Sequence, residues 1–256
     1  MRRSSTWYQP SVAVAVAFVF GLVTASDAGA DRGTRGSSCY FQASSADKAL
    51  KKSDYEAAQA GFTAAIDWTA QNCNDKNTDK RFLFENYMGR AKARTFLEEN
   101  DGAAEDIAHM LQNPFVLRGK LMVGDWRWMQ RALDKAIAQN PKSVTLLETR
   151  AELFEQHARQ IHTGPTAPKG AETKKKLYRE QLKDRTALVE LATSDDDKAQ
   201  RLYRRANVYE FGLKEREPAL KDLDEAVKLD PKPKYAQRRK ELRSKMGFSV
   251  LETWKK

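Results

Sequence analysis

Few residues of this 256-residue chain belong to the types that carry out catalysis or bind metal ions. The three histidines are His109, His157 and His162. His157 and His162 are five positions apart, which on a helix places them about 140° from each other, so they do not share a metal-facing side. The sequence contains no H-E-x-x-H, no G-x-S-x-G and no phosphate-binding glycine loop. We therefore predict no catalytic, cofactor-binding or metal-binding residues.

One short segment begins like a calcium-binding loop. Asp75, Asn77 and Asp79 alternate as the first ligands of such a loop do. However, Lys80 occupies the position that requires glycine for the turn, and Asn86 stands where the bidentate glutamate belongs. We interpret the segment as a polar loop between helices.

The amino-terminal residues have the pattern of a secretory signal peptide. Arg2 and Arg3 precede an uncharged, mostly apolar run over Ser11–Ala25, and Ala28-Gly29-Ala30 follows as a cleavage triplet. The run is shorter than the roughly 20 apolar residues of a membrane span. We expect residues 1–30 to be removed and the mature chain to be periplasmic or secreted. An uncleaved signal anchor is the alternative.

The expected export leads us to predict a disulfide between the two cysteines. Cys39 and Cys73 are the only cysteines, and an exported protein with two cysteines typically forms one disulfide. The bond would tie the polar lead, residues 31–44, to the end of the first strong helix. No C-x-x-C occurs, so a thiol oxidoreductase is disfavoured. Two unpaired thiols remain the alternative.

The rest of the chain, residues 45–256, has the pattern of an all-α domain. The composition is 31% charged with only 13 glycines and 8 prolines, which excludes collagen-like and low-complexity chains. From residue 45 onward apolar residues recur every three or four positions. We expect an irregular segment at 114–125 and an insertion loop at 162–172. The helices are expected over 53–71, 80–99, 103–112, 126–139, 143–161, 173–192, 197–211, 218–229 and 234–246.

Two spacings of small residues repeat along this domain. In the first spacing a small, a large and a small residue lie on one face of a helix. In the second spacing an Arg-Ala pair follows a large residue after two intervening positions. The first occurs at Ala58-x3-Phe62-x2-Ala65 and Ala219-x3-Leu223-x2-Ala226, and the second at Tyr87-x2-Arg90-Ala91, Leu147-x2-Arg150-Ala151 and Leu202-x2-Arg205-Ala206. Two helices approach closely where both present a small residue, so these spacings indicate antiparallel helix pairs.

These residues resemble the tetratricopeptide repeat family, whose units are helix–turn–helix elements of about 34 residues. The resemblance implies a right-handed superhelix of antiparallel helix pairs with three to four degenerate repeats. The best unit is Ala199–Lys232, with an inter-helix turn that is one residue longer than usual. It also implies a binding or assembly module that lacks catalytic activity and uses no cofactor.

In that family the first helix of each pair lines the concave groove. Carried onto this chain, the resemblance implies groove contacts from two helices, namely Glu148, Glu152, Glu155, Tyr203, Asn207 and Glu210. The Lys/Asn clamp that some members use for a terminal carboxylate is matched only at Asn207. Because acids predominate in this set, we expect a groove suited to a basic or mixed peptide. A solvated helix face without a ligand is the alternative.

A second candidate surface is basic. Positive charge gathers at Lys174–Lys176 with Arg179 and Lys183, and again over Lys232–Lys245. Such a face suits an anionic envelope surface, whereas a solvated helix that caps the repeats is the simpler reading. Export disfavours a nucleic acid partner.

The prediction is therefore an exported, periplasmic protein- or peptide-binding module with no activity of its own. The alternatives are a helical cell-envelope enzyme or enzyme subunit, and an envelope-surface binding protein that acts through its basic carboxy-terminal face.

Overall fold

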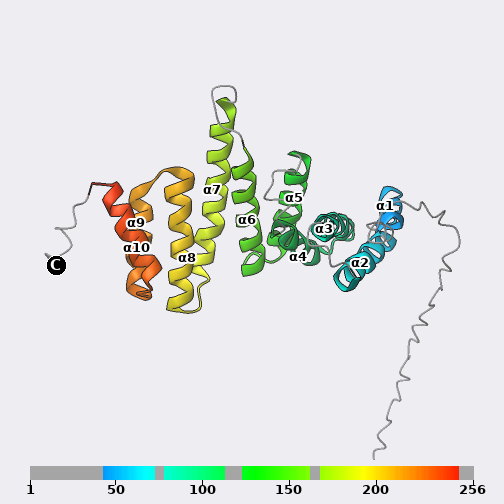
Figure 1. Cartoon of the computed structure of the whole chain (residues 1–256), viewed down its shortest axis with the longest axis horizontal. Coiled ribbons are helices and arrows are strands. Elements are labelled where there is room, and N and C mark those ends of the chain that lie inside the picture. Colours follow the sequence, from blue (N-terminus) through cyan, green and yellow to red (C-terminus); the bar gives the residue numbers. More distant parts are fainter. Residues whose placement is uncertain (1–42, 73–77, 113–122, 162–167, 248–256) are drawn as a thin grey trace, which may run out of the picture. The chain divides into compact units, whose positions relative to one another are not determined.

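The computed structural model describes residues 43–72, 78–112, 123–161 and 168–247 (Figure 1). Within these ranges every regular element is helical, which confirms the predicted all-α class. The elements are α1 (Ala43–Lys51), α2 (Tyr55–Asn72), α3 (Thr78–Phe96), α4 (Asn100–Leu111), α5 (Val123–Gln139), α6 (Val144–Gln160), α7 (Pro168–Glu190), α8 (Asp195–Asn207), the π-helical segment η3 (Val208–Leu213), α9 (Arg216–Leu229) and α10 (Pro233–Lys245). No described helix is long and apolar enough to cross a membrane.

Several sequence predictions fall wholly or partly outside these ranges. The predicted signal peptide, Cys39 and Cys73 are among them, as are Asp75 and Asn77 of the calcium-like loop and most of the segments 114–125 and 162–172. From Thr78 onward the calcium-like segment is part of α3 and not a loop. The helices enter the last two segments, because α5 begins at Val123 and α7 at Pro168. Proline suits the first position of a helix, where the amide hydrogen that it lacks has no helical partner.

The break between α3 and α4 lies earlier than the sequence predicts. Asn100-Asp101-Gly102 reads as a breaker, yet these residues form the first turn of α4. The chain turns instead at Glu98, whose φ of 63° is left-handed. Asp101 lies in the positive first turn of α4, which favours an acid. Gly102 permits the close approach of Arg94, since a Cβ at residue 102 would lie 3.1 Å from the Arg94 Cζ.

Each helix packs against the next along the chain, as in a helical solenoid. The small and large residues of the repeated spacings make these contacts. Ala58, Phe62, Ala65, Ala219, Leu223 and Ala226 are all buried, and so are the Ala91, Ala151 and Ala206 of the second spacing. The prediction that these positions form the helix interfaces is confirmed.

The extra residue of the best repeat unit lies in a helix and not in the turn. Residues Val208–Leu213 continue α8 as a π-helix, in which each turn holds about one residue more than an α-helix. Lys214 then ends the segment with a left-handed φ of 65°. The helix is therefore rephased after Asn207, and side chains beyond that residue point in directions that α-helical spacing does not predict.

Candidate functional site

A groove with a volume of about 980 Å³ lies between α4, α6, α7, α8, η3 and α10. This volume is at the top of the 300–1,000 Å³ range of ligand pockets. Its lining mixes arginine, glutamate and amide side chains with one exposed ring, Phe211, and two half-buried tyrosines. The residues are Ala108, Leu111, Gln112, Glu148, Thr149, Glu152, Glu155, Gln156, Arg159, Tyr178, Gln181, Arg185, Tyr203, Arg204, Asn207, Val208, Phe211, Gly212 and Arg238. We call it the α6–α8 groove.

The structure brings five of the six sequence-predicted contacts together in this groove. They are Glu148, Glu152, Glu155, Tyr203 and Asn207. The sixth, Glu210, is not in the lining, because the π-helical segment rephases the helix and turns Val208 and Phe211 to the groove in its place. Glu210 is 7% exposed, forms ion pairs with Arg238 and Lys245, and borders a second hollow.

The glutamates of the groove already have partners. Glu148 accepts hydrogen bonds from Arg185 and from Arg204, the latter at 2.9 Å. Glu155 is paired with Arg159 and accepts a bond of 3.1 Å from the Gln181 amide. These carboxylates are therefore neutralised by side chains of the protein.

Glu152 differs from the other two glutamates. Its Oε1 accepts a hydrogen bond of 2.6 Å from the Gln156 amide, and no described cation pairs with it.

The expected acidic character of the groove is wrong. Three glutamates line it, but so do four arginines: Arg159, Arg185, Arg204 and Arg238. Arg185 comes from α7 and Arg238 from α10, helices that the family resemblance did not assign to this groove. Since Arg238 is paired with Glu210 and Glu241, which lie outside the lining, the remaining three arginines and three glutamates balance and the groove is close to neutral.

Several polar atoms beside the groove lack a hydrogen bond. The Gln181 Oε1, the Arg185 Nε and the Arg238 Nε are buried and have no partner. Buried polar atoms are almost always paired in folded proteins, so each unpaired one requires an explanation. All three belong to side chains that line this one groove.

Aromatic rings form the apolar part of the groove. Phe211 is 51% exposed, with the Arg238 guanidinium 4.6 Å from its ring centre. Tyr178 packs against Gly212, where an added Cβ would lie 2.6 Å from the ring. Burial, with a further contribution from the charge of Glu155, raises the pKa of Tyr178 and keeps its phenol neutral. Exposed aromatic rings beside arginines are typical of surfaces that bind a protein partner.

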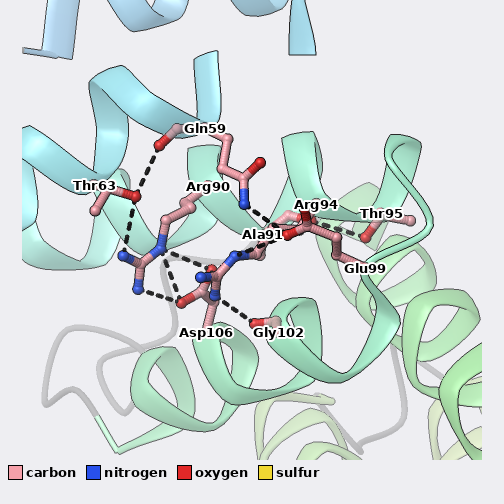
Figure 2. Close-up of polar contacts among 9 residues, drawn as sticks. All are labelled: Gln59, Thr63, Arg90, Ala91, Arg94, Thr95, Glu99, Gly102 and Asp106. Atoms are coloured by element: carbon pink, nitrogen blue, oxygen red, sulfur yellow. Dashed lines mark hydrogen bonds and ion pairs between the residues drawn. The ribbon is translucent and has the colours of Figure 1, made fainter. Parts of the chain in front are cut away.

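The arginines of the repeated Arg-Ala spacing have a different role. Each pairs with a buried aspartate of a neighbouring helix: Arg90 with Asp106, Arg150 with Asp184 and Arg205 with Asp222. Figure 2 shows Arg90 and Arg94 of α3 both pointing at Asp106 of α4, with Thr63 and Gly102 as further partners. These arginine–aspartate pairs join adjacent helices, and the sequence predictions missed them.

Burial and ion pairing have opposite effects on the pKa values of the Arg150–Asp184 pair. Burial raises the pKa of Asp184, against the hydrogen bond and the charge of Arg150, which lower it. For Arg150, burial lowers the pKa, but the bonds to Asp184 and Asp134 outweigh it and the pKa is raised. The burial of Asp184 and its raised pKa are thus explained by its structural pairing with Arg150, without a catalytic role. Among the described residues no three potential ligands gather into a metal site.

The basic carboxy-terminal face is largely paired within the protein. Five of its cations contact carboxylates of neighbouring segments: Lys232, Arg238, Arg239, Arg243 and Lys245. Arg239 and Arg243 share Asp224 of α9, and Lys245 pairs with Glu210 of η3. These contacts attach α10 to the helices before it, as a capping helix requires. By contrast, Lys174–Lys176 and Arg179 of α7 have no ion pair to any described residue.

No family model and no curated protein matches the chain. Among solved structures, it is similar to the crystal structure of a thermophilic tetratricopeptide repeat protein from Thermus thermophilus. The two are 17% identical, the match covers 79% of this chain and 80% of that chain, and the TM-score is 0.32. A likeness of this size does not place the chain in the family.

Proposed function

We propose that the protein is a tetratricopeptide-like module that binds a peptide segment of another protein in the α6–α8 groove and has no catalytic activity of its own. The observation that carries this proposal is the groove itself. Side chains from five helices and the π-helical segment converge on it, and they combine the exposed Phe211 ring and two half-buried tyrosines with charged and amide groups.

The groove offers two kinds of contact that suit an extended or helical peptide. Tyr203 and Phe211 present apolar surface that a ligand side chain would cover, which supplies most of the affinity in protein interfaces. Arg204 and Asn207 present donors to backbone carbonyls or polar side chains of the ligand. Since these groups lie on packed helices, the binding surface is held ready before the ligand arrives.

The compartment is proposed from the sequence alone. We propose that residues 1–30 direct export and are removed near Ala30, so that the groove acts in the periplasm or outside the cell. Amino-terminal sequencing of the purified mature protein tests this proposal. A first residue of Asp31 supports it, and a retained Met1 in the exported protein contradicts cleavage.

Two exposed phenylalanines allow a matched test of the groove. A benzophenone amino acid replaces Phe211 in one variant and Phe96 in another, because both rings are more than half exposed and only Phe211 lies in the groove. After irradiation in cells, we expect discrete adducts at position 211 that are absent at position 96. Peptide mapping of each adduct then identifies the bound segment.

The Tyr203→Ala variant provides the second arm of this experiment. Tyr203 lines the groove and also packs against the Tyr235 ring, with 5.3 Å between the ring centres. Its truncation should reduce crosslinking at position 211, and circular dichroism and the melting temperature of the variant check that the helices are retained. Equal adducts at positions 96 and 211, or adducts that Tyr203→Ala does not reduce, would contradict groove binding.

A further inference from the structure

Two arginines of the groove converge on a single carboxylate oxygen. Arg185 Nη1 of α7 and Arg204 Nη1 of α8 both donate to Glu148 Oε2 of α6. One carboxylate neutralises one guanidinium, so this cluster retains one positive charge. The Nε of Arg185 is buried and makes no hydrogen bond to the described protein atoms.

Arg204 is the accessible member of the cluster. Its side chain is 44% exposed, and Glu148 is its only recorded partner in the described part of the chain. Asn207 follows three positions later on the same helix, hence on the same face, and it also lines the groove. A guanidinium and an amide at this separation can both donate to one carboxylate.

The other two groove glutamates differ in what they offer a ligand. Glu152 has no cationic partner among the described residues and accepts a hydrogen bond of 2.6 Å from the Gln156 amide. Glu155 is paired with Arg159, and a ligand cation would have to displace that arginine. Phe211 lies seven positions beyond Arg204 and offers an apolar surface in the same groove. The excess cation of the Arg185–Glu148–Arg204 cluster and the Phe211 ring together complement a ligand that combines a carboxylate with a nearby apolar side chain, whereas Glu152 alone would complement a cation.

We propose that the α6–α8 groove recognises acidic peptide segments, with a ligand carboxylate on Arg204 and Asn207 and an apolar ligand side chain against Phe211. This inference rests on the proposed function and gives the groove the opposite charge preference from the one that the sequence predicts. Glu148 acts as a positioning residue, because its carboxylate holds Arg185 and Arg204 together at one end of the groove.

The experiment compares three labelled pools of twelve-residue peptides with the full mature chain. All pools carry random apolar residues at half of the positions, and the other positions are Glu in one pool, Gln in the second and Lys in the third. We expect the Glu pool to bind about tenfold more tightly than the Gln pool, and the Lys pool to bind most weakly. The preference should shrink as salt is added, since partly exposed charges are screened.

Two substitutions at Arg204 assign the preference to this end of the groove. Arg204→Gln should remove most of the difference between the Glu and Gln pools, and Arg204→Glu should shift the preference to the Lys pool. Arg131→Gln is the matched control, because Arg131 is exposed on α5 and is not part of the groove lining. Since Arg204 and Arg131 are exposed, the two glutamine variants should nearly retain the wild-type melting temperature. Arg204→Glu places a carboxylate beside Glu148, so its circular dichroism spectrum and melting temperature are measured before its binding is compared.

The outcomes separate this inference from the proposed function. Equal binding of the three pools that Tyr203→Ala reduces would retain the peptide groove and overturn the acidic preference. A preference for the Lys pool, or a Glu preference that Arg204→Gln leaves intact, would also overturn it. If no pool binds, both the groove function and its charge preference fail.

Discussion

Asp106 is the buried anion on which two arginines of α3 depend. Its side chain is 0% exposed, and it accepts hydrogen bonds from Arg90 Nε, Arg90 Nη2 and Arg94 Nη1. The Arg90 and Arg94 side chains are themselves only 13% and 19% exposed. In Asp106→Ala, neither guanidinium would have a carboxylate of equal strength within reach, so we expect a large loss of stability.

The size of the loss follows from this geometry. Hydrogen bonds to charged groups contribute about 1.5–3 kcal/mol each, but three bonds to one carboxylate are not additive. Removing one partner of a buried ion pair costs about 3–5 kcal/mol, because the remaining charge stays desolvated. Arg90 keeps a contact of 3.3 Å to Thr63. Arg94 keeps one of 2.9 Å to the Gly102 carbonyl and an ion pair of 3.8 Å to the half-exposed Glu99. Since these contacts remain, we expect a loss of about 3 kcal/mol, at the lower end of that range.

Urea unfolding followed by circular dichroism measures the loss, with hydrogen exchange to locate it in α3 and α4. In a chain whose helices contact mainly their neighbours, the weakened segment should lose exchange protection first. The matched control is Glu85→Ala, which removes an ion pair to Arg81 whose side chains are 57% and 42% exposed. That control should cost less than about 1 kcal/mol.

Two results would refute this reasoning. One is a loss below about 1 kcal/mol for Asp106→Ala, because it would mean that the two arginines find water or other partners without strain. The other is an equal loss for Asp106→Ala and for a variant with Arg90, Arg94 and Asp106 all replaced by apolar residues of similar size. The apolar variant should be the more stable of the two, since it buries no unpaired charge.

Three further predictions test separate parts of the structure. Gly89→Ala should cost about 1–3 kcal/mol, since its Cβ would lie 2.2 Å from the Phe62 ring, whereas Gly124→Ala meets nothing within 4 Å and should cost nothing in a urea titration. Burial lowers the pKa of His157 below its ordinary value of 6.5. At a pH between these two pKa values the unfolded chain binds more protons than the folded protein, so the free energy of unfolding falls as the pH drops. His157→Gln should lessen this loss between pH 7.5 and 5.5, and an unchanged pH dependence, or one equally altered by the control His109→Gln, would contradict the assignment. Cys39 and Cys73 should give no free thiol in the denatured, unreduced mature protein and two after reduction, so thiols detected before reduction would disprove the disulfide.

The helices and their interfaces could be predicted because they depend on short-range patterns. The spacing of Ala219, Leu223 and Ala226 fixes one face of a helix whatever lies opposite, and all three are buried in α9 as predicted. The segment Ser194–Asp197 combines a capping hydroxyl with acids, and Ser194 does cap α8 by accepting a bond of 3.2 Å from the Asp197 amide. Such signals are carried by neighbouring residues alone.

The charge of the groove could not be predicted in the same way. Which arginine meets Glu148 depends on the approach of α7 and α8 to α6, and Arg185 lies 37 positions away in the sequence. Long side chains also reach across helix boundaries, so a face that looks acidic on one helix is neutralised from the next. A search of the following helices for arginines would have found the candidates that could pair with the groove glutamates. It would not have shown which arginine pairs with which glutamate.

The π-helical segment links the structural pairs to the groove. Arg90 and Asp106 are 16 positions apart, whereas the corresponding Arg205 and Asp222 are 17 apart, and η3 lies between the latter two. Because η3 takes up the extra residue, Arg205 still reaches Asp222 at 2.7 Å and the helix interface is kept. The same residue rephases the helix so that Phe211, and not Glu210, faces the groove. One additional residue thus leaves the packing of the repeat intact and changes which side chain a ligand would meet, as is common for π-helical insertions at functional sites.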